Sequence, residues 1–255
     1  MGKTSVQEFY RTADFETWSE CTSLNPDEKY ILEKYLDPAA KTVEAGTAGG
    51  RIVLELEKLG FSQLYGYDFV PEFIERARQK NPQQSIQFEV QDATQLDYEN
   101  NSFDQLIYLQ QIMSTIDDEQ GRTKAFKEAY RILRPGGTAL FSFISFETAT
   151  GGITYPLYRL YLKLVRALRG SNYSTQYFPY ASSGGKFNLS SVLLGSGPYL
   201  YRYKPQEAYD ALTAAGFDVV AVGSREQILQ GQMYDQLEAL RSQPLRGALY
   251  CVCKK

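Results

Sequence analysis

The sequence contains no histidine among its 255 residues, and this absence excludes much familiar chemistry. Histidine is the commonest general base and metal ligand near neutral pH, so His-based catalytic triads and His-ligated zinc sites drop out. Cysteine is scarce as well. The sequence has three cysteines, an odd number: Cys21, Cys251 and Cys253. The last two lie in one apolar, strand-like segment. We therefore predict neither disulfides nor a metal site, and expect Cys251 and Cys253 to pack in the core.

Long apolar runs and a basic excess are lacking too. There is no run of about 18 apolar residues and no charged-then-apolar leader, so we expect neither a membrane span nor export. The formal net charge of -3 argues against a protein that mainly holds a nucleic-acid backbone. With 43% apolar and 22% charged residues, the composition is typical of a globular protein, which we expect in the reducing cytoplasm.

Strand-like and helix-like periods alternate over the first half of the chain. Strands are predicted at 41–45, 64–67, 86–90, 103–109 and 138–143, with later ones at 217–222 and 245–252. Between them the apolar spacing predicts helices. Ile52, Val53, Leu56 and Leu59 follow the spacing of one helix, and Pro71 begins the next. Asp117 or Asp118 caps a third helix that Pro135-Gly136-Gly137 breaks, and a last helix is predicted over 205–215. This alternation indicates parallel βαβ units in a doubly wound α/β fold.

The rhythm breaks at about residue 145, where Gly151-Gly152, Gly184-Gly185 and Gly195-Ser196-Gly197-Pro198 interrupt any regular period. We divide the chain into an N-terminal helical cap (1–40), a core (41–144 and 205–255) and a lid insertion (145–204), all within one domain.

Candidate ligand-binding residues follow three predicted strands. Glu44 to Gly50 forms a glycine-rich turn before a helix, which suits close approach of a ligand. Asp68 ends the next strand, where a carboxylate suits ribose hydroxyls, and Asp92-Ala93 follows the third strand. Such a turn is also commonly a simple connection, and each aspartate is also suited to capping the following element. A dinucleotide fingerprint would need glycine where Ala48 and Arg51 stand, so an oxidoreductase is disfavoured.

Four segments together resemble, in order and spacing, the motifs of class I S-adenosylmethionine-dependent methyltransferases. They are VEAGTAGG (43–50), GYDFVPEFIERAR (66–78), FEVQDATQLDYENNSFD (88–104) and YRILRPGGTALFS (130–142). The resemblance implies a seven-stranded, mostly parallel sheet with an antiparallel last strand and helices on both faces. It also implies S-adenosylmethionine as cofactor and S-adenosylhomocysteine as product.

The resemblance assigns roles to particular residues. Glu44 and the backbone around Gly46 would hold the methionine part, and Asp68 would take the ribose hydroxyls with Phe69 beside the adenine. Asp92 and Ala93 would contact the adenine edge, and the segment from Leu109 to Gln111 would border the sulfonium. Ala48 departs from the pattern, because it stands where a second motif glycine is usual.

The resemblance predicts methyl transfer to a small-molecule acceptor. Without histidine, catalysis would rest on proximity and orientation. Gln110, Gln111 and Glu147 are weak candidates for orienting or deprotonating the acceptor. A protein or lipid-like acceptor and a non-catalytic, cofactor-binding or partner-binding module remain as alternatives.

The insertion is rich in tyrosine and contains a basic amphipathic segment. The tyrosines at 155, 158, 161, 173, 177, 180, 199, 201 and 203 would either line a substrate lid or form a satellite core. In the segment 157–169, Leu157, Leu160, Tyr161, Leu164, Val165 and Leu168 follow a helical stripe, with Arg159, Lys163, Arg166 and Arg169 on the remaining positions. We expect this helix to pack its apolar face on the domain, with membrane contact as the lesser alternative.

Overall fold

The computed structural model describes most of the chain, namely residues 10–11, 15–116, 118–147, 154–180, 182–183, 186–187, 189–195, 198–241 and 245–255. The predictions made at Asp117, Gly151-Gly152, Gly184-Gly185 and Ser196-Gly197, and part of the predicted N-terminal cap, fall outside these residues.

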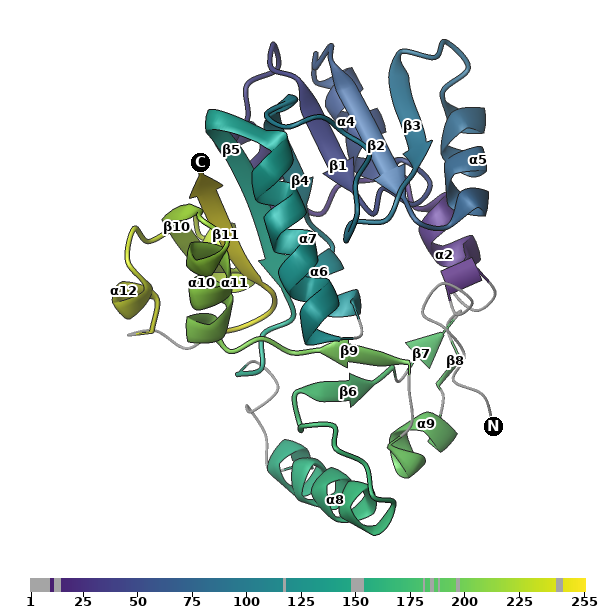
Figure 1. Ribbon diagram of the computed structural model, residues 1–255, viewed down its shortest axis with the longest axis vertical. Helices are drawn as coiled ribbons and strands as arrows, with labels where there is room; N and C mark the ends of the chain where they lie inside the picture. Colours follow the sequence, from purple (N-terminus) through teal and green to yellow (C-terminus); the bar gives the residue numbers. More distant parts are fainter. Residues whose placement is uncertain are drawn as a thin grey trace.

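A seven-stranded sheet forms the centre of the molecule, in the order β10-β11-β5-β4-β1-β2-β3 (Figure 1). Its strands are β1 (Thr42–Ala45), β2 (Leu64–Asp68), β3 (Ile86–Val90), β4 (Phe103–Tyr108), β5 (Leu133–Phe143), β10 (Asp218–Ser224) and β11 (Leu249–Lys254). β11 pairs antiparallel with β5 and β10, and the other neighbours pair in parallel. The predicted fold class is confirmed.

Two apolar cores lie on opposite faces of this sheet. One is covered by α3 (Pro26–Tyr35), α4 (Arg51–Lys58), α5 (Pro71–Lys80) and α11 (Arg225–Leu229). The other is covered by α7 (Glu119–Ile132), α10 (Pro205–Ala214) and α12 (Leu237–Arg241). Alternation along β11 divides its side chains between the cores, with Tyr250 and Val252 in the first and Cys251 and Cys253 in the second. Both cysteines are free and buried, as predicted.

Local sequence signals place most helix ends correctly. Pro71 begins α5, and Asp118 caps α7 by accepting a hydrogen bond from the Gly121 amide at 2.7 Å. Leu59, the last residue of the predicted helical spacing, caps α4 and is exposed, because the helix ends at Lys58 before the left-handed Gly60.

The predicted start of β5 at residue 138 is wrong, since the strand begins directly after α7 at Leu133. Pro135 ends the helix as expected, but Leu133 then pairs with Phe103 before the register shifts. Gly136 takes a left-handed φ of +79° and donates its amide to the Lys255 carbonyl at 2.7 Å. The glycines therefore form an irregular start to the strand.

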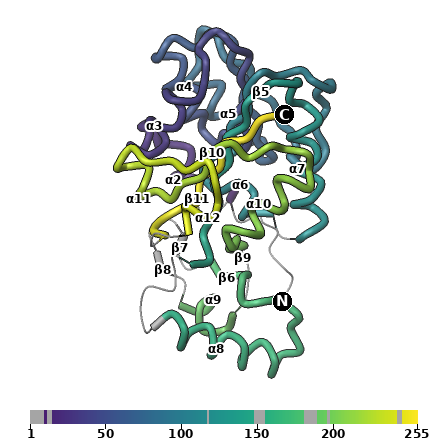
Figure 2. The backbone as a smooth tube through the Cα atoms, turned by 90° about the vertical axis from the view of Figure 1, so that its left-hand side faces the viewer, coloured from purple at the N-terminus to yellow at the C-terminus, as the bar shows by residue number. Residues whose placement is uncertain are grey.

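The segment between β5 and α10 contributes separate small elements beyond the carboxyl ends of the parallel strands (Figures 1 and 2). They are α8 (Thr154–Leu168), β6 (Tyr177–Pro179), β7 (Ser182–Ser183), β8 (Lys186–Phe187), α9 (Leu189–Leu194) and β9 (Tyr199–Tyr201). β6 pairs with β9 and β7 with β8, both antiparallel. The exact division between core and insertion stays a prediction. Every helix in the described ranges is too short or too polar to cross a bilayer.

Many tyrosines of this segment form a satellite core. Contacting rings with centroids 4.6 to 5.0 Å apart connect Tyr173, Tyr177, Tyr199, Tyr201 and Tyr203. Arg122 of α7 lies 3.8 Å from the Tyr201 ring centroid and donates to the Tyr177 hydroxyl at 2.9 Å. These contacts attach the aromatic cluster to the main domain and favour the packing alternative for these residues.

Candidate cofactor site

A cavity of about 480 Å³ opens at the carboxyl ends of β1, β2, β3 and β4. Its walls come from the turns after these strands, from α2 (Phe15–Glu20), from α6 (Ile112–Thr115) and from the start of α7. In an open parallel sheet, ligands bind at this edge, where the strand order reverses. Here the order reverses between β1 and β4.

Six of the seven predicted cofactor-binding residues line this one cavity, namely Glu44, Gly46, Asp68, Phe69, Asp92 and Ala93. The seventh, Leu109, is buried in the core and does not line it. Their individual roles stay predictions. Segments 24 to 49 residues apart in the chain nevertheless supply one surface, because parallel strands bring their carboxyl ends to one edge.

The glycine-rich turn after β1 uses three left-handed residues. Gly46, Ala48 and Gly50 have φ values of +61°, +47° and +82°. Ala48 thus adopts, as alanine, a conformation that favours glycine. Its amide donates to Asp68 Oδ2 at 3.0 Å, which fixes the turn to the end of β2. Gly49 instead allows α2 to pack closely against the turn, because a Cβ there would lie 2.3 Å from the Ser19 carbonyl oxygen.

Glu44 is a buried carboxylate at the end of β1. Its Oε2 accepts hydrogen bonds from Thr47 Oγ1 at 2.6 Å and from the Val53 amide at 3.3 Å. Burial raises the pKa of Glu44 to about 7, despite these hydrogen bonds and the neighbouring Arg51. Glu44 is therefore poised to ionise when a cationic ligand approaches.

Asp68 and Asp92 combine local and cavity-lining positions. Asp68 accepts from the amides of Val70 and Ala48, both at 3.0 Å, and burial raises its pKa to about 6. Asp92 Oδ1 accepts from the Thr94 amide and hydroxyl, both at 2.8 Å. Each carboxylate therefore holds the turn that follows it and also faces the cavity. The local role that the sequence suggested for both aspartates is confirmed, and their role in cofactor binding stays a prediction.

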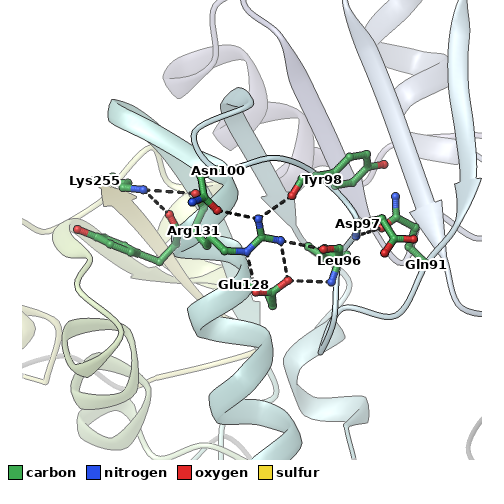
Figure 3. A network of polar contacts seen from close by, with 9 residues as sticks. Gln91, Leu96, Asp97, Tyr98, Asn100, Glu128, Arg131 and Lys255 are labelled. Carbon is green, nitrogen blue, oxygen red and sulfur yellow. Dashed lines mark hydrogen bonds and ion pairs between the residues drawn. The ribbon is translucent and has the colours of Figure 1, made fainter.

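Arg131 holds the loop that follows β3 (Figure 3). Its guanidinium donates to the carbonyls of Leu96 and Tyr98 at 2.8 and 2.6 Å and to both oxygens of Glu128 at 2.8 Å. Glu128 in turn accepts from the Leu96 amide at 2.8 Å. The loop after β3 is thus fixed to α7 by charge-assisted hydrogen bonds.

Two glutamines at the end of β4 mark the boundary with a second cavity of about 290 Å³. Gln110 and Gln111 are both left-handed, with φ values of +56° and +59°, and such strain concentrates at functional sites. Gln110 lines both cavities, and Gln111 lines the second with Ser145 and Tyr250. Glu147, the third weak catalytic candidate, is exposed and lines neither cavity.

A buried ion pair that sequence reasoning missed supports Gln110. Arg51 forms two hydrogen bonds with Glu28, at 2.7 and 2.8 Å, and Gln110 also donates to Glu28. Arg51 lines the cavity, and its nearness to Glu44 favours the charged form of that carboxylate. The partners are 23 residues apart in the chain, and no periodicity in the sequence predicts their contact.

Trp18 on α2 is another lining residue without a sequence signal. α2 lies against α5, where Phe15 stacks on Phe73 at 5.2 Å and Glu20 pairs with Arg76 at 2.7 Å. The Trp18 indole nitrogen is buried without a hydrogen-bond partner among the described residues.

The charges that line the cavity favour a cationic ligand. Four carboxylates line it, from Glu44, Asp68, Asp92 and Asp118, against the cations Arg51 and Lys124. Arg51 is already paired with Glu28. The fold and this site define a protein of the Rossmann-like class with a cavity lined by carboxylates at the edge of the sheet where such folds bind ligands.

Comparison with known proteins finds similarity to methyltransferases. Residues 43–141 match the family model described as a methyltransferase domain. Demethylmenaquinone methyltransferase of Deinococcus radiodurans is 32% identical over 128 residues, which cover 49% of this chain and 51% of that protein. The match thus spans about half of that relative's length.

Two further similar proteins are also methyltransferases by name. Ubiquinone/menaquinone biosynthesis C-methyltransferase UbiE of Desulfotalea psychrophila is 25% identical over 170 residues, covering 65% of this chain and 67% of that protein. A crystal structure of a SAM-dependent methyltransferase of Methanosarcina mazei shares the fold, with a TM-score of 0.66 at 18% identity over 91% of this chain and 98% of that one. Residues 43–141 thus resemble a methyltransferase domain, and the chain shares the fold of a solved S-adenosylmethionine-dependent methyltransferase.

The residues in the cavity fit this cofactor. S-adenosylmethionine, which the sequence resemblance implies, carries positive charge and ribose hydroxyls, and the cavity offers the carboxylates of Glu44 and Asp68, whose pKa values are raised by burial. An apolar and aromatic wall for the adenine is available in Phe69, Phe73 and Ile112.

Proposed function

We propose that the protein transfers a methyl group from S-adenosylmethionine to a small-molecule acceptor. The observation that supports this most is the gathering of Glu44, Asp68 and Asp92 around one cavity at the reversal of strand order. The cofactor supplies a methyl group on sulfur, whose transfer leaves a neutral thioether. The chain's own residues bind it, exclude water and orient the acceptor, which is sufficient for in-line displacement without a histidine base.

The second cavity is where we place the acceptor. It adjoins the donor cavity at Gln110, so a molecule seated in it would approach the donor at the end of β4. The Gln110 side chain is held by its hydrogen bond to Glu28. The backbone amide of Gln111 donates to Ser142 Oγ at 3.0 Å. Both side chains carry neutral amides, which orient a polar acceptor but do not take its proton.

The names of the two relatives suggest the first acceptor class to assay. One is named for demethylmenaquinone and the other for ubiquinone and menaquinone biosynthesis. We therefore propose a quinone-type ring, in its reduced form, as the first candidate acceptor. A ring of this kind offers hydroxyl groups to the polar residues that line this cavity, among them Gln110 and Ser145.

A labelling experiment tests the proposal. Purified protein is incubated with methyl-labelled S-adenosylmethionine and either reduced demethylmenaquinone or a fractionated cell extract. Label in the small-molecule fraction is expected. Label in protein bands would contradict the acceptor class. Binding of S-adenosylhomocysteine without any transfer would instead support the non-catalytic alternative.

A further inference from the structure

The charges of this chain are distributed very unevenly. Between Glu147 and Glu207 lie 59 residues without a single Asp or Glu, and seven Lys or Arg residues stand among them. The other 196 residues contain 20 basic and 30 acidic residues, so the body of the protein is negative while this segment is strongly positive. This contrast is hidden in the net charge of -3.

The main helix of this segment, α8, buries an arginine rather than its leucine stripe. Arg166 of α8 is buried and donates to the carbonyls of Ser174 and Tyr177, both at 2.5 Å. Leu162 is buried beside it, and the Tyr158 hydroxyl donates to the Val192 carbonyl at 2.9 Å. The expectation that α8 packs its leucine stripe on the domain is therefore wrong. The tyrosines and backbone carbonyls of the insertion provide partners for arginine instead.

The leucine stripe consequently faces outward. Seven leucines on α8 and α9 have exposed fractions of 45% to 79%, namely Leu157, Leu160, Leu164, Leu168, Leu189, Leu193 and Leu194. The two helices are joined, because Tyr161 Oη donates to the Leu193 carbonyl at 2.5 Å and Arg169 to that of Leu194 at 2.7 Å. Both helices lie at the end of the molecule farthest from the carboxyl-terminal strand (Figures 1 and 2).

We infer that this leucine face of α8 and α9 docks on the surface of an anionic phospholipid bilayer. Exposed leucines accompanied by Lys163 and Arg169, both exposed, combine the apolar and cationic contacts that interfacial helices use. A second copy of this chain is a poor occupant, because face-to-face contact would oppose two segments that each lack acidic residues. The inference does not depend on the identity of the acceptor, since a docked enzyme with a water-soluble acceptor would bind vesicles equally well.

Vesicle binding of the full chain tests this inference. Vesicles of phosphatidylcholine alone are compared with vesicles of equal parts phosphatidylcholine and phosphatidylglycerol, by co-sedimentation at low and high salt. We expect binding to the anionic vesicles that weakens with salt, and little binding to the neutral ones. The double variant Leu160→Gln/Leu164→Gln should bind roughly tenfold or more weakly.

A matched variant controls for altered surface leucines in general. Leu59→Gln/Leu229→Gln changes two leucines that are 39% and 53% exposed on the main domain, and it should bind vesicles like the parent. Thermal unfolding without vesicles verifies that both variants are folded. The inference is overturned if the parent binds no vesicles, binds both compositions equally, or keeps its binding in the α8 variant. A concentration-dependent dimer lost in the α8 variant, without vesicle binding, would assign the face to a second copy.

Discussion

Glu44 and Asp68 show how single residues tune the donor cavity. Both are buried, both accept hydrogen bonds from the turn they stabilise, and both have pKa values raised by burial. The sequence predicted their position because each ends a strand of a parallel sheet. It did not predict their protonation, which depends on their burial and, for Glu44, also on the neighbouring Arg51.

Glu44 should make the stability of the cofactor-free protein depend on pH. Its pKa is about 7 when folded and near 4.5 in the unfolded chain, so the folded state holds a proton that the unfolded state has released. Stability should therefore fall as pH rises from about 4.5 to 7, by roughly 3 kcal/mol at most. Thermal unfolding across this range checks it, and Glu44→Gln should flatten the dependence. An unchanged slope in the variant would contradict the assignment.

Asp68 should be required for cofactor affinity. Asp68→Asn removes the negative charge and leaves one oxygen for the two amides that now donate to the carboxylate. We expect binding of S-adenosylhomocysteine, measured by calorimetry, to weaken about thirtyfold or more, because loss of a buried charged partner costs about 2 to 5 kcal/mol. Asp210→Asn on the exposed face of α10 makes the same chemical change and should bind normally. Equal affinity of the two variants would refute the role of Asp68.

At the scale of elements, periodicity predicted which segments are helices and strands better than it predicted which side they bury. The leucine stripe of α8 was visible in the sequence, but its outward orientation follows from the contacts of Arg166 with carbonyls of the insertion. The position of α2 could not be predicted from the sequence either, because α2 packs against Gly49 and α5 through contacts between residues far apart in the chain. Local patterns contain no information about such pairings.

The loop after β3 should depend on Arg131 for its order. Arg131→Ala removes the hydrogen bonds to Leu96, Tyr98 and Glu128, and should cost about 1.5 to 3 kcal/mol of stability. Hydrogen exchange of the loop amides should accelerate, and S-adenosylhomocysteine affinity should fall because Asp92 and Ala93 lose their support. Arg134→Ala, which breaks a more exposed ion pair with Asp104, is the matched control. Unchanged loop exchange in Arg131→Ala would contradict this role.

At the scale of the whole molecule, the sheet order places two cavities and the insertion at one edge. The donor side was predictable, because parallel strands bring their ends together whatever the loops contain. The acceptor side was not, since the second cavity joins Asp27 and Arg225 from elements far apart in the chain. The body of the molecule is negatively charged and the insertion positively charged, a separation of charge that the net charge of -3 does not show.

The binding of S-adenosylhomocysteine in the cavity is the central claim, and Trp18 provides its most direct test. It is the single tryptophan of the sequence and lines the donor cavity, so its fluorescence reports on that cavity alone. Titration with S-adenosylhomocysteine should produce a saturable change in emission at one ligand per chain, while NAD should produce none. An emission unchanged by S-adenosylhomocysteine, together with an unshifted thermal midpoint, would show that the cavity does not bind the cofactor and would contradict the account.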